Sequence, residues 1–290
     1  MTRRVESLER GALYMVVSAA LFALMGAAVK VAAQTLPNTM IVFVRNAVSL
    51  LLLLPWLLRR GPAVAATRHL GGHLVRGLAG LAAMSCFFFA IGRMPLADAV
   101  LLNYSLPLLL PLVERVWLGE AVPRGLWRAL AVGFVGILLV LRPGVGVFHP
   151  VALLPIVAAG FAALAQVAIR RLTRTEPVTR IVFHFSLIAT VVSAVPVPFT
   201  WKSPTPWEWA ALAASGLFAT IGQLLLTRAY ACAPAGRVGP FLYTGVIFSG
   251  VLDWLMWDVL PGAPFVFGAL LVTLAAILAL RLHTRPRSPG

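Results

Sequence analysis

The chain has 290 residues, of which 60% are hydrophobic and only 11% are charged, and its formal net charge is +15. A soluble protein of this size cannot bury that much apolar surface, so the composition predicts an all-α integral membrane protein. A β-barrel is excluded because the apolar runs are long and continuous, without period-two alternation. Arginines stand at the ends of these runs rather than on one amphipathic face, which argues against nucleic-acid binding and indicates topology signals.

Ten apolar stretches are long enough to cross a bilayer, and short loops connect them. The first is too long for the core of a cleavable signal peptide, so we expect it to remain as a transmembrane helix. Residues 284–290 are expected to form a disordered basic tail. The predicted spans are 11–33, 38–58, 72–91, 95–118, 125–141, 150–170, 177–199, 207–230, 236–256 and 262–282.

The two halves of the chain resemble each other at a nearly constant offset. A shift of 139 residues places Tyr104 on Tyr243 and Glu114 on Asp253, and other matches share this offset or one of 140. No single match is strong, but their common spacing over the whole length predicts an internal repeat of five spans.

Because each repeat has an odd number of spans, the second must enter the membrane from the opposite side to the first. We expect inverted repeats at residues 1–142 and 143–283, with a substrate site between them near the middle of the bilayer. If the N-terminus is cytoplasmic, nearly all cationic residues fall on that side, and the other side receives only Lys30, Arg93, Arg142 and Lys202. Both termini are therefore predicted to be cytoplasmic, in a bacterial-type inner membrane.

The stretch 95–118 carries the most informative polar residues. Asn103, Pro107, Pro111 and Glu114 follow one another at spacings of four, four and three, which places them on one face of the single helix expected here. Such a face suits a protein interior or a watery path rather than lipid. Pro107 and Pro111 free backbone carbonyls and permit a bend, so they are candidate hinges, although membrane helices also tolerate proline without one.

This organisation resembles the drug/metabolite transporter superfamily, in particular its EamA-type ten-helix permeases. The residues that carry the resemblance are Arg45 in the second span, Pro107 and Glu114 in the fourth, the sequence LGE at 118–120, and Gly133, Gly136 and Arg142 in the fifth. The resemblance implies a permease that exports small metabolites, amino acids or drugs through a cavity formed mainly by spans one, three, four, six, eight and nine. Exporters of aromatic and other neutral amino acids look most similar.

Two features of related families are missing from the sequence. Small multidrug members of the superfamily carry a glutamate in the first helix for exchanging protons against cationic drugs, whereas spans 11–33 and 150–170 contain no acidic residue. Sugar-phosphate carriers of the superfamily lead one to expect paired Lys and Arg residues in the ninth and tenth spans, and we find no such set. Cation–proton exchange and sugar-phosphate transport are therefore not favoured.

Nine side chains are candidates for contacting a substrate, because they place hydrogen-bonding groups or aromatic rings within the spans. They are Tyr104, Tyr243, Asn103, Ser105, Thr244, Gln166, Gln223, Phe22 and Phe89. Each tyrosine combines a hydroxyl group with a flat apolar face, which suits an amino acid with a large side chain. The alternative is hydrogen bonding between helices for the polar residues, and packing against lipid or neighbouring helices for the phenylalanines.

Five ionisable residues are candidates for gates. Arg45 lies about seven residues inside its span, so it requires a carboxylate or carbonyl partner, and Asp253 and Asp98 are candidates by depth. His184 and Glu114 lie at a comparable depth from the opposite face. We expect two roughly symmetric polar clusters, one near each mouth, that either act as gates or hold helices together. His184 is also a candidate proton relay.

The leading hypothesis is a secondary transporter that exports small neutral metabolites, with aromatic or hydrophobic amino acids favoured, by alternating access. The alternatives are proton-coupled drug or metabolite efflux, an intramembrane enzyme and a non-transporting scaffold. An enzyme would need paired catalytic acids, a Ser/His set or a metal-binding motif, and the acidic residues are few and scattered. We expect no enzymatic activity, cofactor or metal. The expected partners are a small-molecule substrate and the lipid bilayer, and a monomer is favoured.

Overall fold

The computed structural model describes residues 7–91, 93, 96–142, 150–258 and 260–284, and within them helices are joined by short loops without any strand. The first half contains α1 (Leu8–Ala32), α2 (Asn38–Arg60), α3 (Leu70–Ile91), α4 (Leu96–Asn103), α5 (Leu106–Leu118) and α6 (Arg124–Leu141). The second half contains α7 (Leu153–Leu172), α8 (Val178–Ala194), α9 (Val197–Thr200), α10 (Pro206–Cys232), α11 (Ala235–Val238), α12 (Thr244–Trp257) and α13 (Ala263–Thr284). Three 3-10 helices lie between them, η1 (Pro62–Ala65), η3 (Pro150–Ala152) and η4 (Gly239–Tyr243).

Nine helical stretches in the described part of the chain are long and apolar enough to cross a membrane. The one predicted span that is not among these nine, 177–199, is the seventh in chain order and is divided into α8 and α9. Helix α8 has only 17 residues, or about 25 Å of helix. The division occurs at Pro196, and Pro198 follows within α9; neither residue has an amide hydrogen to continue the α-helical ladder. The chain is therefore a helical membrane protein, and one predicted span is shorter than the length used to recognise the others.

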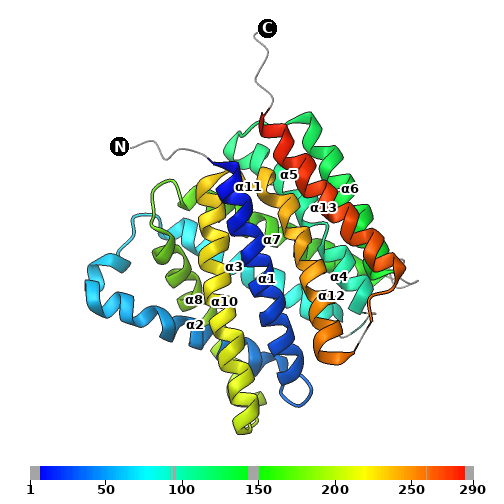
Figure 1. Ribbon diagram of the computed structural model, residues 1–290. Coiled ribbons are helices and arrows are strands. Elements are labelled where there is room, and N and C mark those ends of the chain that lie inside the picture. The colour runs from blue at the N-terminus through cyan, green and yellow to red at the C-terminus, as the bar shows by residue number, and fades with distance from the viewer. Residues whose placement is uncertain (1–6, 92, 94–95, 143–149, 259, 285–290) are drawn as a thin grey trace.

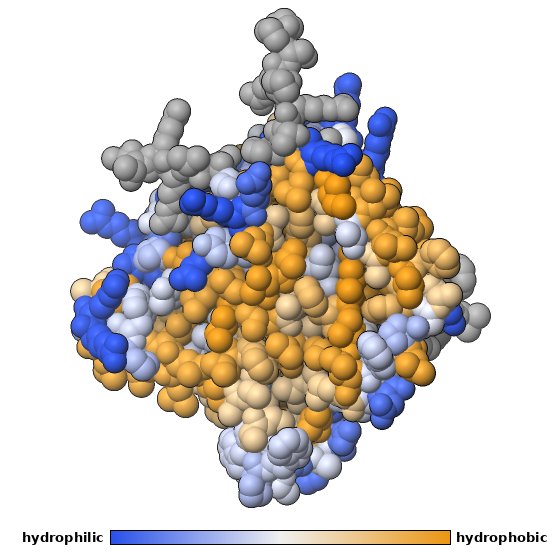
Figure 2. Space-filling model, viewed as in Figure 1, coloured by the Kyte–Doolittle hydropathy of each residue, from blue (hydrophilic) through white to orange (hydrophobic). Residues whose placement is uncertain are grey.

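An apolar belt crosses the middle of the molecule on the face that Figure 2 shows. Figure 2 shows apolar residues across the centre of the visible face and hydrophilic residues concentrated toward its ends. Large apolar side chains such as Val116 and Phe199 are 87% exposed, which is costly in water and favourable in lipid. The belt agrees with the composition and fits a protein that is surrounded by hydrocarbon.

Two ends of the molecule can be distinguished by the chain path. Helix α1 begins and α13 ends at one end, which we call the terminal face; α1 ends and α2 begins at the other, which we call the distal face (Figure 1). The amide of Ser7 donates to the carbonyl of Cys232, so α10 also ends at the terminal face.

The two halves of the chain are paired crosswise rather than packed as separate units. Helix α1 of the first half lies along α10 of the second, and α7, at the matching place in the second half, lies along α3 of the first. Helix α2 packs against α8, and α6 packs against α13, so each of these matching pairs joins the two halves. The interior is therefore shared between the halves, with α4, α5 and α12 placed beside α7 and α1.

The fourth span is not the single helix that the sequence predicted. It is interrupted at Tyr104 and Ser105. The amide of Tyr104 is shared between the carbonyls of Val100 and Leu101, and the amide of Ser105 donates to Leu102, three residues back. Pro107 explains the interruption, because it lacks the amide hydrogen that would bond to the carbonyl of residue 103. The predicted polar face is nevertheless directed inward on α5, where Pro107, Pro111 and Glu114 are all buried.

The ninth span is interrupted at the matching place. It consists of α11, the 3-10 helix η4 and then α12, and Tyr243 directly precedes α12. Pro240 has no amide hydrogen, and the 3-10 bonds of η4 replace the α-helical ladder here. Both halves thus contain a broken helix, and the break lies beside the tyrosine that the repeat alignment had paired.

Candidate functional site

The two helix breaks bring Tyr104 and Tyr243 together. Their ring centroids are 6.2 Å apart, with the planes tilted by 49°. Tyr243 is fully buried, and its ring occupies the space above Gly133 of α6, where an added Cβ would collide with it. The sequence had matched these tyrosines by repeat position, and the structure places them in contact across the two halves.

Two hydroxyl groups at the helix breaks have no hydrogen-bond partner within the described part of the chain. Among the described residues, neither the buried hydroxyl of Tyr243 nor that of Ser105 makes a hydrogen bond. Thr244 donates to the carbonyl of Phe241 at 2.7 Å, so its hydroxyl is already used within the ninth span. Asn103 is half-buried at the end of α4. Tyr243 and Ser105 therefore retain hydrogen-bonding capacity that a ligand or water can satisfy.

A pocket of about 430 Å³ lies between α4, α6, α12 and the start of α13. Its lining includes Tyr104 near the helix break and Asp253 toward the distal face. Arg142 and Phe265 also line it. The pocket thus connects the surroundings of the tyrosine pair with the distal mouth, and its volume is within the range of small-molecule sites.

A second polar cluster lies where α2, α3, α8 and α10 approach one another. Arg76 of α3 is 5% exposed, and its Nη2 donates to Oε1 of Gln223 at 3.0 Å. The Arg76 guanidinium lies 3.9 Å from the ring centroid of Phe185. Arg45 of α2 reaches the sulfur of Met84 at 3.7 Å. The predicted residues Gln223 and Arg45 therefore belong to one region, together with Arg76, which the sequence analysis had treated as a topology signal.

The remaining predicted substrate contacts, Gln166, Phe22 and Phe89, lie in three different environments. Gln166 accepts a hydrogen bond from the hydroxyl of Tyr230, so its amide is already partnered. Phe22 packs against Gly222 of α10, where an added Cβ would lie 3.0 Å from the ring. Phe89, which the sequence analysis named as a candidate substrate contact, is 51% exposed near the end of α3, and the Arg93 guanidinium lies 3.4 Å from the centroid of its ring.

At the terminal face, Glu114 joins the fourth span to the ninth. Its two carboxylate oxygens accept hydrogen bonds from the amides of Ala235 and Gly236 at 2.5 and 2.7 Å, and the residue is 3% exposed. Glu120, also at this end, contacts Arg174 at 2.5 Å and Arg170 at 3.4 Å. The Glu114 contacts hold α5 against the short helix α11, and the Glu120 contacts join the loop after α5 to α7 and the loop that follows it.

At the distal face, Asp253 pairs with Lys30 at 2.7 Å, and both side chains are about half exposed. The predicted pairing of Asp253 with Arg45 is wrong, because α12 packs beside the end of α1, whereas Arg45 faces α3. The side chain of Asp98, the other candidate partner, lies outside the described residues. Lys30 also lies 3.8 Å over the ring of Trp257.

His184 is not part of the Glu114 cluster. It stacks on His73 of α3 with ring centroids 4.2 Å apart, and its Nδ1 lies 3.0 Å from the carbonyl of Arg180. Among the described residues, neither ring nitrogen of the buried His73 has a hydrogen-bond partner. The predicted cluster at this mouth therefore divides into two groups, one around Glu114 and one around the histidine pair.

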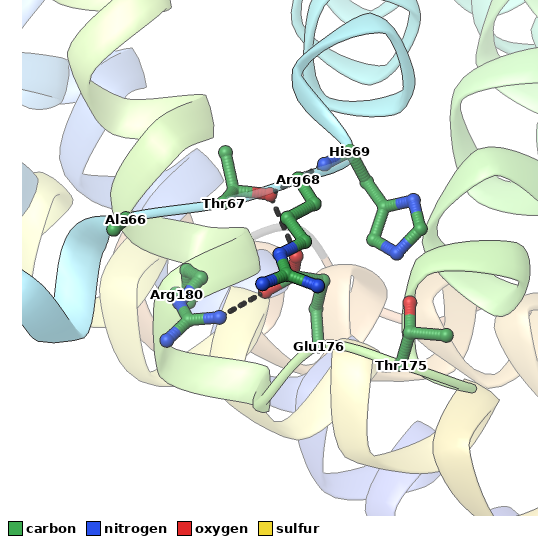
Figure 3. Close-up of a pocket in the computed structure, with 7 residues that line it drawn as sticks. All are labelled: Ala66, Thr67, Arg68, His69, Thr175, Glu176 and Arg180. Atoms are coloured by element: carbon green, nitrogen blue, oxygen red, sulfur yellow. Dashed lines mark hydrogen bonds and ion pairs between the residues drawn. The ribbon is translucent and has the colours of Figure 1, made fainter.

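Beside the histidine pair, a pocket of about 320 Å³ opens at the terminal face (Figure 3). Glu176 at its edge accepts hydrogen bonds from Thr67 and Arg180, each at 2.6 Å. Burial alone would raise the pKa of Glu176, but these two hydrogen bonds and the charge of Arg180 hold it below its ordinary value. The carboxylate thus ties the loop before α3 to the loop before α8.

Comparison with known proteins gives matches over nearly the whole chain. Residues 9–142 and 149–281 each match the EamA-like transporter family. The pseudopaline exporter CntI of Pseudomonas aeruginosa is 35% identical over 283 residues, which cover 96% of this chain and 98% of that protein. A riboflavin transporter of Vibrio cholerae is 25% identical over 281 residues, with 95% and 94% covered.

Two further comparisons extend this picture. An S-adenosylmethionine uptake transporter of Rickettsia bellii is 24% identical over 240 residues, which cover 83% of this chain and 82% of that protein. A solved structure described only as a crystal structure of a protein superposes with a TM-score of 0.83 at 22% identity. It covers 97% of this chain and all of that one, so the helical arrangement itself is a known fold.

Proposed function

Because the chain belongs to the EamA-like transporter family, we propose that it is a secondary transporter that exports small metabolites across the inner membrane by alternating access. In this proposal residues 1–142 and 143–283 form two inverted repeats of five spans. The terminal face is cytoplasmic, and the distal face is periplasmic. The positive-inside bias of the sequence supports this orientation, because nearly all arginines then fall on the terminal side.

The observation that carries the proposal is the meeting of two broken helices at Tyr104 and Tyr243. Interrupted spans at matching places in two repeats are typical of transporters whose site lies near the middle of the bilayer. Irregular backbone at that depth is tolerated only when protein or a water-filled cavity surrounds it. We therefore propose that the substrate binds beside the tyrosine pair and reaches it through the distal pocket that Tyr104 lines.

The direction of transport and the substrate class are parts of the same proposal. Export is favoured because the 35% identical relative is named an exporter, although other relatives are named uptake transporters. Amino acids, and amino-acid-like metabolites with an apolar or aromatic portion, fit a site that combines aromatic faces with unpartnered hydroxyl groups at Tyr243 and Ser105. Asn103, Thr244, Gln166, Gln223 and Phe22 stay proposed contacts, and Phe89 is left out because it is exposed.

The proposed gates are the contacts at the two faces. At the terminal face, Glu114 holds α5 to α11 through two backbone amides. At the distal face, Lys30 and Asp253 form an exposed ion pair beside the pocket. Opening one face while the other closes would carry the site between the two sides. Pro107 and Pro111, which are buried on α5, are the proposed hinge positions.

The test is counterflow into proteoliposomes that contain the purified protein, with a panel of radiolabelled amino acids and related metabolites. Counterflow without an ion gradient is expected for a facilitative carrier. A requirement for an imposed pH gradient would favour the proton-coupled alternative, for which the His73–His184 stack is the structural candidate. No flux of any solute in the panel would contradict the proposal.

A further inference from the structure

Two arginines lie on membrane helices that both pack against α8, Arg45 on α2 and Arg76 on α3. Arg45 lies in the first third of α2, which begins at the distal face, and Arg76 lies in the first third of α3, which begins at the terminal face. Arg45 reaches α3 at the sulfur of Met84, which lies about two helical turns from Arg76 on that helix. Their Nε atoms are both buried and make no hydrogen bond within the described part of the chain.

Within the described part of the chain, neither arginine has an acidic partner at ion-pair distance. The ion pairs of the described residues involve Lys30, Arg170, Arg174 and Arg180, and none includes Arg45 or Arg76. Arg45 contacts the sulfur of Met84, and Arg76 contacts the neutral amide of Gln223 and the ring of Phe185. Two positive charges therefore face the protein interior without any carboxylate from the described chain to balance them.

This arrangement is unfavourable unless an anion joins it. Arginine does not lose its proton in proteins, so both charges persist inside the bilayer. An ionisable residue within a transmembrane segment marks a functional site by default, because its burial is strongly unfavourable without a counter-charge. A structural role would be served better by a neutral side chain at either position.

We propose that Arg45 and Arg76 bind the carboxylate groups of an anionic substrate, so that the transported metabolite carries at least two carboxylates. This inference rests on the proposed transport function and specifies its substrate class. The planar N–H fork of a guanidinium matches a carboxylate with two parallel hydrogen bonds. Gln223 supports the site, since its Oε1 holds Arg76 and its amide nitrogen can donate to the same ligand.

Carboxylates suit the geometry better than one phosphate group. Each guanidinium is held by its own neighbours, Arg45 by Met84, and Arg76 by Gln223 and Phe185. Two separately held, singly charged groups match two singly charged partners on one ligand. The substrate is then an amino-acid-like acid with an additional carboxylate, rather than the neutral amino acid that the sequence favoured.

The first experiment measures binding to the purified, full-length protein in lipid nanodiscs by calorimetry. The probes are the dicarboxylates from malonate to pimelate, the matching uncharged diamides, and glycerol phosphate. Binding is expected for at least one dicarboxylate, not for its diamide, and is expected to be weaker for glycerol phosphate. Failure of the whole dicarboxylate series to bind would overturn the proposal, and so would equal binding of an acid and its diamide.

Substitutions of Arg45 and Arg76 test whether these two residues bind the dicarboxylate. Arg45→Gln and Arg76→Gln are each expected to weaken dicarboxylate binding about tenfold to a hundredfold, which is the usual effect of losing a charge-assisted pair. Arg45→Lys keeps the charge and is expected to retain part of the affinity. The matched control is Arg59→Gln on the same helix as Arg45, at an exposed position, where no change is expected. Unchanged binding by both interior variants would contradict the proposal.

A stability readout separates a binding role from a structural one. Without ligand, Arg45→Gln is expected to raise the unfolding temperature, because it removes an unbalanced charge; a marked fall would show that Arg45 is structural. Counterflow distinguishes this inference from the transport function. If an uncharged solute is carried equally by the wild type and both Gln variants, the inference fails and the function stands. If no solute is carried but dicarboxylates bind through these arginines, the transport function fails and the site stands.

Discussion

The two faces of the molecule carry equivalent residues in different states. The repeat offset relates Lys30 to Arg170 and Asp253 to Glu114. At the terminal face the acid is 3% exposed and bonds to two backbone amides, whereas at the distal face the acid and its lysine are about half exposed beside a pocket. At these two acids the terminal mouth is sealed by buried hydrogen bonds, whereas the distal mouth is accessible; the pocket at the terminal face is lined by other residues. If the distal face is periplasmic, as proposed, this asymmetry corresponds to the outward-open state of the proposed alternating-access cycle.

The largest expected effect comes from Glu114→Ala, which removes the acceptor for the amides of Ala235 and Gly236. Two buried donors lose their partner, which costs about 2 kcal/mol or more and opens the terminal mouth. Cys232, half-buried at the end of α10, reports the opening in a Cys86→Ser background: a maleimide reagent is expected to label it faster from the terminal side. Glu114→Gln keeps one acceptor and is the control. Unchanged labelling in the alanine variant would contradict the sealed-mouth interpretation.

Gly236→Ala tests the same mouth by steric means. A Cβ at this position would lie 2.9 Å from Cβ of Pro111 and 3.0 Å from Oε2 of Glu114, so α11 and α5 must separate. We expect a loss of about 1–3 kcal/mol and a lower unfolding temperature. The matched control is Gly160→Ala within α7, where an added Cβ meets nothing within 4 Å and helix propensity favours alanine. A greater loss for the control than for Gly236→Ala would refute the explanation.

The substitution Glu176→Gln tests how a loop at the terminal face differs from the related loop at the distal face. The carboxylate of Glu176 is buried and bonded to Thr67 and Arg180, whereas the related distal loop uses the exposed Glu208 with Thr35. Because the pKa of folded Glu176 is below its ordinary value, its stabilisation is complete above that value and is lost as the pH falls through the folded pKa. Thermal unfolding scanned from pH 7 to 3 is expected to show a smaller loss for Glu176→Gln than for the wild type. Parallel pH profiles would contradict this.

The smallest effect is expected at Lys30 and Asp253. An exposed ion pair contributes less than about 1 kcal/mol, so Asp253→Lys is expected to change the unfolding temperature little. Transport is the sensitive readout, since the pair lies beside the distal pocket. Exchanging both charges, Lys30→Asp with Asp253→Lys, is expected to recover activity lost in either single variant. If the double variant is no better than the singles, the pair has no role in closing the distal mouth.

The sequence predicted the class of protein and most helix positions, because apolar length and arginine placement determine them directly. It also paired Tyr104 with Tyr243, since a repeat offset gives equivalence without needing coordinates. It missed the interruption of both helices, although Pro107 and Pro240 were available signals. An apolar stretch long enough for one helix does not reveal where its hydrogen-bond ladder changes to 3-10 geometry.

Side-chain partners were harder to predict than positions. Depth alone suggested Asp253 for Arg45, but depth says nothing about which helix a side chain faces, and α12 packs on α1. Arg76 was read as a topology signal because it lies near a predicted span boundary, yet it is buried and directed inward. An arginine several residues inside an apolar stretch was the available signal. The stacking of His73 on His184 joins the two halves of the chain, and no local sequence pattern predicts such a contact.

The crosswise pairing of helices has a consequence for biogenesis. Helix α1 finds its principal neighbour in α10, and α3 finds its own in α7, so the first five spans leave the translocon with their inward faces uncovered. The N-terminal half therefore cannot complete its helix packing until the C-terminal half has been synthesised and inserted. A chain that stops between the halves should be recognised as unassembled and degraded, whereas two half-chains produced together should reassemble into one protein.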